Sequence, residues 1–402
     1  MTTIRPLCAI ACVTAFAATS SAAFGQAPER ARDWGIPFTG TPGPLNAITD
    51  VPGVTVGMVT LIEGDGPLVK GRGPIRTGVT AILPRGKTFD PVYAGWGTLN
   101  GNGDMTGTHW ITESGFMETP ILITNTGNVG IVRDAAWQWM DRNRYYAPFQ
   151  PGYWYAYPVV TETWDGGLND INGQHVRPEH VWQALDSAHG GPVPEGAVGG
   201  GTGMVCHEFK GGTGTSSRKI ENEFGAYTVG VLVQANYGTR KEMRLGGVPI
   251  GKQLLEVPLP VLHDLPEAVA GRFRRDADRG SIIVIIATDA PLDSIQCRRL
   301  ALRAPIGIAR MGGKGGNGSG DLFLAFATGN PGAFSLTRAT TVTQFPNEGM
   351  NGLFTAVADA TEEAISNALA AGRDMTGIQG NSVRGLPKTL VQDFLRQHGL
   401  MK

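Results

Sequence analysis

The sequence has few cysteines and few charged residues for its length. Only 4 of its 402 residues are cysteine, and charged residues make up 17% of the chain. Cys8 and Cys12 lie in an apolar N-terminal segment, which leaves Cys206 and Cys297 for the folded part. Two cysteines are too few for a disulfide framework, and a chain of this length does not need one to build a core. We expect both to be small buried side chains.

Sequence patterns for metals and nucleotides are also missing. The chain contains no CxxC, HExxH or carboxylate-rich calcium loop, and its 7 histidines have no ligand spacing, so neither a metal nor another cofactor is predicted. Residues 199–203 are rich in glycine, but Met204 stands where a dinucleotide motif needs its third glycine. A net charge of −1 argues against a nucleic-acid or membrane-surface partner.

Glycine is the residue type in excess. The chain has 58 glycines in 402 residues, about twice the usual share of ~7%. They follow no fixed period, which excludes collagen and solenoid repeats. They cluster between apolar runs, as expected where tight turns and exposed backbone amides shape a site.

The first residues have the pattern of a secretory signal. Arg5 supplies a basic start, residues 6–18 are mostly apolar, and Ser21 to Ala23 offer small residues for cleavage. The apolar stretch is shorter than the ~20 residues of a membrane-spanning helix. We expect residues 1–27 to be a signal peptide whose end is not fixed, and the mature protein to be periplasmic.

Apolar patterns along the remaining chain predict intermingled strands and helices. Strands are expected at 53–62, 77–84, 153–163, 226–235, 281–288 and 322–328. Helices are expected at 133–145, from Pro178 through Leu185, from Asp293 to about Ala304, and at 351–371 and 387–398. Because the pattern has no regular βαβ repeat, we expect a layered α/β fold in which helices cover sheets.

An abrupt step in composition occurs at the Gly280–Ser281 bond. The charged stretch 264–279 precedes it, and the branched run 281–288 reads as a strand buried on both faces. Ser281 is either the first residue of an ordinary strand or, if the bond is cut, a new N-terminal nucleophile on a rigid strand.

Four other polar residues stand at or next to predicted strands. Ser319 and Asp321 lie two residues apart in a glycine-rich segment, so in extended chain they share a face, with Cα atoms roughly 7 Å apart. They could equally cap a turn. Asn236 ends a core strand and could also be a turn residue. Glu162 lies on an aromatic, apolar strand, where a carboxylate needs a cation or hydrogen-bond donors.

Together these segments resemble the family of self-processing serine aminopeptidases that includes the β-peptidyl aminopeptidases and the L-aminopeptidase/D-amidase/D-esterase. The resemblance runs from about Arg32 to the C-terminal helix. The segments that carry it are 41–54, 161–171, 199–204, 233–238, 280–281 and 318–321.

The resemblance implies a fold and a chain organisation. It implies a four-layer αββα sandwich resembling N-terminal-nucleophile hydrolases but differently connected. It further implies self-cleavage between Gly280 and Ser281 into an α chain, 28–280, and a β chain, 281–402. The two chains would form one interwoven catalytic domain, and αβ units would assemble as a homo-oligomer.

The resemblance also implies roles for single residues. Ser281 would be the nucleophile, and Asn236 would stabilise the oxyanion. Glu162 would bind the free amino group of the substrate, and the pair Ser319 and Asp321 would assist the nucleophile.

The substrate class stays partly open. The expected substrate is a small peptide or amino-acid amide, with a β-amino acid at its N-terminus. Some β-peptidyl aminopeptidases carry Glu where Asp321 stands and Asn where Gly280 stands, so an L-aminopeptidase/D-amidase/D-esterase activity is the alternative. A rival of another class is a non-catalytic periplasmic binding protein, which predicts an uncut chain.

Overall fold

The computed structural model describes residues 29–146, 154–261, 263 and 280–401. The predicted signal peptide and the charged stretch 264–279 lie outside the described residues. None of the helices in this part of the chain combines the length and the apolar character that crossing a membrane requires.

Within the described residues, two large sheets form the centre of the molecule. One has the strand order β1-β2-β5-β6, and the other has the order β4-β3-β12-β11-β10-β9. Their strands are β1 Thr55–Glu63, β2 Ile75–Lys87, β3 Val92–Gly101, β4 Phe116–Met117, β5 Ile121–Asn125, β6 Val159–Thr163, β9 Gly212–Asn222, β10 Gly225–Asn236, β11 Ser281–Thr288 and β12 Gly320–Ala327. Two short hairpins pair β7 Val205–Cys206 with β8 Phe209–Lys210, and β13 Met375–Thr376 with β14 Ser382–Val383.

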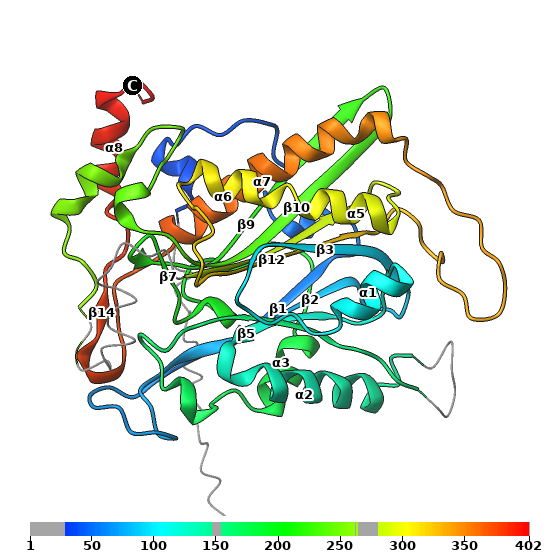
Figure 1. Cartoon of the computed structure of the whole chain (residues 1–402), viewed down its shortest axis with the longest axis horizontal. Helices are drawn as coiled ribbons and strands as arrows, with labels where there is room; N and C mark the ends of the chain where they lie inside the picture. The colour runs from blue at the N-terminus through cyan, green and yellow to red at the C-terminus, as the bar shows by residue number, and fades with distance from the viewer. Residues whose placement is uncertain (1–28, 147–153, 262, 264–279, 402) are drawn as a thin grey trace, which may run out of the picture.

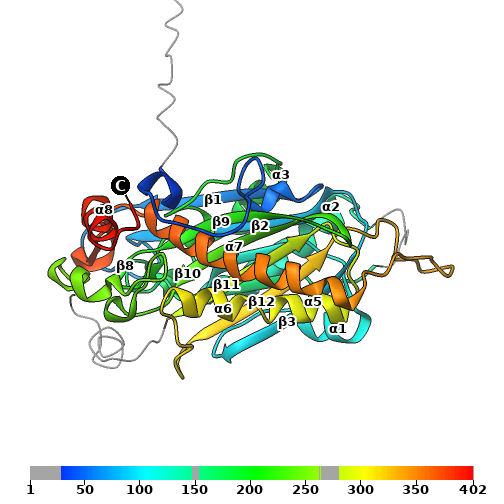
Figure 2. The ribbon, with the colours of Figure 1, turned by 90° about the horizontal axis from the view of Figure 1, so that it is seen from above.

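Helices cover the outer face of each sheet. Figure 1 shows α5, α6 and α7 above the six-stranded sheet, and α2 and α3 below the four-stranded one. Viewed from above, α7 runs across β9 and β10 (Figure 2). The helices are α1 Thr108–Ser114, α2 Val129–Arg142, α3 Pro178–Asp186, α5 Ser294–Ala301, α6 Ala304–Arg310, α7 Met350–Ala370 and α8 Lys388–Gln397.

The buried side chains form three apolar layers, which make the fold a four-layer αββα sandwich as predicted. One layer lies between the six-stranded sheet and its helices, one between the two sheets, and one between the four-stranded sheet and α2 and α3. The position of β11 accounts for its apolar sequence. Ile282, Val284 and Ile286 lie in the first layer, whereas Ile283 and Ile285 lie in the second. A strand buried on both faces needs an unbroken apolar run.

Several predicted elements are confirmed, with shifted ends in places. The strands at 226–235 and 281–288 and the helices from Pro178, at 351–371 and at 387–398 are all present. The strand expected at 153–163 was wrong at its start, since it begins at Val159. Helix α2 begins at Val129, earlier than expected, and Pro305 does not end the helical region but lies in the first turn of α6, a position that proline tolerates.

Two of the missed strands, β3 and β9, have sequences that do not reveal their burial. Strand β3 contains Gly95, where a Cβ would lie 2.3 Å from the backbone nitrogen of Arg298 in α5. Strand β9 carries the polar run Ser216, Ser217 and Arg218, all of them buried. Close helix packing in one case and buried polar contacts in the other therefore replace the apolar alternation that marks a strand.

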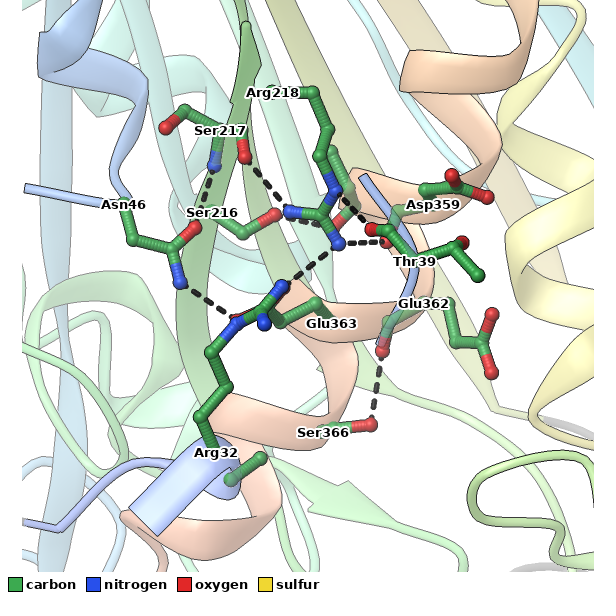
Figure 3. A network of polar contacts seen from close by, with 12 residues as sticks. Arg32, Thr39, Asn46, Ser216, Ser217, Arg218, Asp359, Glu362, Glu363 and Ser366 are labelled. Atoms are coloured by element: carbon green, nitrogen blue, oxygen red, sulfur yellow. Dashed lines mark hydrogen bonds and ion pairs between the residues drawn. The ribbon is translucent and has the colours of Figure 1, made fainter. Parts of the chain in front are cut away.

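A buried ionic network joins segments that are far apart in the sequence. Glu363 of α7 accepts hydrogen bonds from Arg32 at 2.6 and 2.8 Å, lies 2.7 Å from Arg218 of β9, and accepts from Asn46 at 2.6 Å (Figure 3). The side chains of Glu363 and Arg218 are 0% and 2% exposed. Because Gly280 lies between Arg218 and Glu363 in the sequence, the network connects the two sides of the predicted cleavage point.

We expect Glu363→Gln to lower the free energy of unfolding by about 3–5 kcal/mol at pH 7, because it leaves the buried Arg218 without its counter-charge. Burial raises the pKa of Glu363, but the Arg32 hydrogen bond, the charge on Arg218 and the Asn46 hydrogen bond outweigh it, so the pKa is lowered overall. The carboxylate therefore stabilises the fold above its ordinary pKa, and this contribution is lost as the pH falls through the lowered value.

Urea unfolding at pH 7 and in acid measures the difference in the free energy of unfolding between the wild type and Glu363→Gln. Asp393→Asn is the matched control, since its pair with Arg396 is about half exposed and such pairs contribute about 0–1 kcal/mol. A Glu363→Gln effect at pH 7 no larger than that of the control contradicts the prediction.

Candidate active site

The order and direction of the strands bring the predicted site residues to one end of the six-stranded sheet. Strand β11 is antiparallel to β10 and parallel to β12, and β12 is antiparallel to β3. The starts of β11 and β12 and the ends of β10 and β3 therefore meet at the same edge. Ser281 begins β11, Asn236 ends β10, Ser319 directly precedes β12, and Asn100 and Gly101 end β3.

Ser281 is the first residue of β11 and is only 8% exposed. Its Oγ accepts a hydrogen bond of 3.0 Å from the backbone N–H of Gly320. A donor aimed at a hydroxyl oxygen favours its deprotonated form, which is the form that attacks a carbonyl. The serine side chain is thus held in place by the backbone of the neighbouring strand.

Gly280 is packed against the end of β10. A Cβ at this position would lie 2.1 Å from the carbonyl oxygen of Asn236 and 2.4 Å from Cα of Tyr237. Its φ lies outside the left-handed region, so lack of space, and not backbone conformation, requires glycine here. The carbonyl before Ser281 is therefore fixed by close backbone packing.

Ser319 and Asp321 face each other as the sequence pattern predicted. Ser319 Oγ lies 2.7 Å from Asp321 Oδ2 and 2.8 Å from the carbonyl oxygen of Gly316, and both side chains are buried. Gly320 lies between them, and its N–H is the donor to Ser281. The pair therefore brackets the peptide that contacts the serine.

Asn236 is the direct cross-strand partner of Ser281. Such partners have Cβ atoms about 4.5–5.5 Å apart. Its Oδ1 accepts the Val205 N–H at 2.8 Å, and its Nδ2 donates to the Trp164 carbonyl at 3.0 Å. These two contacts fix which end of the amide is the donor, and Nδ2 carries a second hydrogen that can serve an oxyanion.

Glu162 is buried near the end of β6, on the other sheet. Its Oε1 accepts the Asp104 N–H at 3.0 Å, and its Oε2 accepts from Thr126 Oγ1. Burial raises the pKa of Glu162, and the hydrogen bonds from Thr126 and Asp104 oppose that shift. The carboxyl group has hydrogen-bond donors but, among the described residues, no cation within ion-pair distance. A substrate ammonium can supply that charge.

Gly103 lies next to both the Glu162 carboxyl group and Gly320. A Cβ on Gly103 would be 3.3 Å from Glu162 Oε1 and 3.2 Å from Gly320 Cα. The Glu162 carboxyl group and Gly320, whose N–H contacts Ser281, therefore both lie next to Gly103. A substrate whose carbonyl reaches Ser281 can place its amino group toward Glu162.

Sequence reasoning missed the groups that hold these side chains. They are the Gly320 N–H, the Thr126 hydroxyl, and the turn after β3, where Asn102 Nδ2 donates to the Gly318 carbonyl at 2.8 Å and Asn102 N–H to the Ser319 carbonyl at 3.0 Å. The one available signal was the run Asn100-Gly-Asn-Gly-Asp104, a polar, glycine-rich segment like the one at 316–321.

Cys206 and Cys297 are both buried thiols, as predicted. In the part of the chain that the structure describes, His, Cys, Asp and Glu side chains form no group of three that could hold a metal ion.

Comparisons with known proteins identify the family of the chain. The model of peptidase family S58 matches residues 46–383. A curated relative, the β-peptidyl aminopeptidase of Sphingosinicella microcystinivorans, is 49% identical over 381 residues, which cover 94% of each chain.

Solved structures show the same fold. The β-aminopeptidase of a Burkholderia species has a TM-score of 0.81 at 49% identity, covering 92% of this chain and 99% of its own. The L-aminopeptidase D-Ala-esterase/amidase of Ochrobactrum anthropi, described as a new variant of the N-terminal-nucleophile hydrolase fold, has a TM-score of 0.82 at 43% identity, covering 93% and 99%. The predicted fold class is confirmed, and the chain belongs to peptidase family S58.

Proposed function

We propose that this chain is a self-processing serine aminopeptidase that removes N-terminal β-amino acids from short peptides and amides. The observation that carries the proposal is the meeting of Ser281, its Gly320 donor and Asn236 at one sheet edge, with the buried Glu162 beyond Gly103. The proposal also draws on the similarity to the two β-aminopeptidases.

The first reaction is cleavage of the chain itself. Ser281 Oγ attacks the Gly280 carbonyl carbon, the C–N bond breaks, and the proton from Oγ passes to the nitrogen, which becomes the free amine of Ser281. The product is an ester between Gly280 and Oγ. Water then hydrolyses this ester, which leaves a Gly280 carboxylate and restores the hydroxyl group. The α chain would end at Gly280 and the β chain would begin at Ser281.

The second reaction uses the new N-terminus. Free α-amines ordinarily have a pKa of about 7.7–8.0, the range in which such a group can take the proton from Oγ near neutral pH. Oγ attacks the substrate carbonyl, the second Asn236 Nδ2–H donates to the oxyanion, and the leaving amine departs with a proton. Water then releases the acyl group. The Ser319–Asp321 pair holds the Gly320 peptide against Oγ throughout.

Glu162 selects substrates that have a free amino group. Its buried carboxylate gains a counter-charge when a substrate ammonium enters, and a blocked N-terminus offers none. Because Glu162 and Ser281 belong to different sheets, the distance between them limits how many atoms separate the ammonium from the scissile carbonyl. The enzyme therefore acts at the amino end of short substrates.

The second candidate activity is that of an L-aminopeptidase with D-amidase and D-esterase activity. It is favoured by the similarity to the Ochrobactrum anthropi enzyme. The two candidates share nucleophile and mechanism and differ only in the acyl group that they accept.

The proposal includes the cellular location and the assembly of the enzyme. Residues 1–27 direct export to the periplasm, and the processed αβ units assemble as a homo-oligomer.

We expect purified protein to hydrolyse β-alanyl 4-nitroanilide at least tenfold faster, by kcat/KM, than the L- and D-alanyl anilides. The Ser281→Ala variant is the control and should remain one uncut, inactive chain, because it lacks the attacking oxygen. Preference for an alanyl anilide favours the second activity. An intact, inactive wild type favours the binding-protein alternative.

Glu162→Gln should raise KM for aminoacyl anilides at least roughly thirtyfold and leave self-cleavage intact, since losing one member of a desolvated charge pair costs about 2–5 kcal/mol. The carboxylate is the binding form, and burial raises its pKa. In the wild type, binding should therefore weaken as the pH falls through a value above ~4.3, the ordinary value for Glu.

The matched control is Glu179→Gln, an exposed carboxyl group on α3. Steady-state kinetics between pH 4 and pH 8 should show a rise in KM toward acid pH that the control keeps and Glu162→Gln lacks. Protonation of the Ser281 amine should lower kcat toward acid pH in all three proteins. Loss of self-cleavage in Glu162→Gln would instead assign Glu162 a structural role.

A further inference from the structure

Lys210 of β8 is a lysine with 0% exposure. Among the described residues, no carboxylate lies within ion-pair distance of its Nζ. Burial lowers the pKa of Lys210 to about 7, and the neighbouring Cys206 opposes that shift. An unpaired buried lysine is costly to a fold, so its contacts call for an explanation.

Three backbone carbonyls surround the Lys210 ammonium. Nζ lies 2.7 Å from the Met204 oxygen, 2.8 Å from the Gly211 oxygen and 3.5 Å from the Gly201 oxygen. An ammonium has three N–H bonds and no acceptor site, which matches three carbonyls, whereas a neutral amine has only two N–H bonds. The contacts therefore favour the charged form.

Two of these carbonyls belong to the glycine-rich segment 199–204, which the proposed chemistry does not use. This segment has no room for side chains at several positions. A Cβ on Gly200 would lie 2.3 Å from Gln234 Oε1, and one on Gly203 would lie 2.3 Å from the Arg76 oxygen. The segment is thus held rigidly between strands, and its carbonyls point to fixed positions.

The contact with Met204 connects Lys210 to Asn236 through one peptide group. The Met204 carbonyl and the Val205 N–H belong to one peptide group. Lys210 donates to the carbonyl, and the N–H donates to Asn236 Oδ1 at 2.8 Å. A cation at the oxygen of a peptide group polarises it and strengthens its N–H as a donor. The same effect passes through the Asn236 amide to the Nδ2 hydrogens.

We infer that Lys210 is a positioning residue for the oxyanion donor: through the Met204–Val205 peptide it fixes and polarises the side-chain amide of Asn236. The inference rests on the proposed function, because it assumes that Asn236 donates to the oxyanion. Lys210 touches neither substrate nor nucleophile, and its effect falls on turnover and not on binding of the ammonium at Glu162.

Lys210→Met tests this, because it keeps an unbranched side chain of similar length and removes charge and donors. We expect kcat for β-alanyl 4-nitroanilide to fall roughly tenfold with KM within twofold, a smaller loss than the ~10²–10³ for removal of an oxyanion donor itself. The control is Lys219→Met, an exposed lysine on β9, which should leave both constants unchanged.

A double-mutant cycle separates positioning from a general structural effect. In an Asn236→Ala background, Lys210→Met should lower kcat less than twofold further, because the group through which it acts is gone. An equal factor in both backgrounds, an effect on KM alone, or no effect overturns the inference.

Self-cleavage and a cooperative thermal unfolding transition identify the variants that have folded. If Lys210→Met gives no folded protein, Lys210→Gln takes its place in the cycle with the same expected results. Failure of the proposed function is seen in the wild type itself, whereas failure of this inference is seen only in variants of an active wild type. If the active substrate is an alanyl anilide, the cycle is measured with that substrate.

Discussion

The position of β11 within its sheet is the constraint on which the site depends. The strand has an antiparallel neighbour on one side and a parallel neighbour on the other, and each of its residues is buried. Its first residue, Ser281, therefore lies beside the end of β10 and the start of β12. Asn236 comes from the first of these strands and the Gly320 amide from the second, so no flexible loop is needed to bring these two groups next to Ser281.

The same packing would hold the two parts of the chain together after the proposed cleavage at Gly280. Both neighbours of β11 are bound to it by continuous strand pairing, and β10 belongs to the segment before Gly280. The buried ion pair of Arg218 and Glu363 also joins the segments on either side of the proposed cleavage point. Cleavage at Gly280 would therefore release an amine and a carboxylate without separating the two parts of the sheet.

Much of the framework was predictable from local sequence, whereas the supporting contacts were not. The apolar run of β11 and the two-residue spacing of Ser319 and Asp321 are local patterns, and the structure confirms both geometries. The donors to Glu162, Asp104 and Thr126, are distant from it in the sequence, and only the folded topology brings them together. Glycine-rich and polar strands were missed for a related reason, since their burial depends on a helix or an ionic partner distant in the sequence. The site residues were reached through the family resemblance, and their catalytic roles stay predictions.

The central claim is that Ser281 becomes an N-terminal nucleophile, and the intact mass of the purified protein under denaturing conditions tests it most directly. The account predicts two masses, one for a chain that ends at Gly280 and one for residues 281–402, and N-terminal sequencing of the smaller chain should begin at Ser281. A single mass for the uncut chain in an active preparation, or a smaller fragment that begins at any other residue, would contradict it.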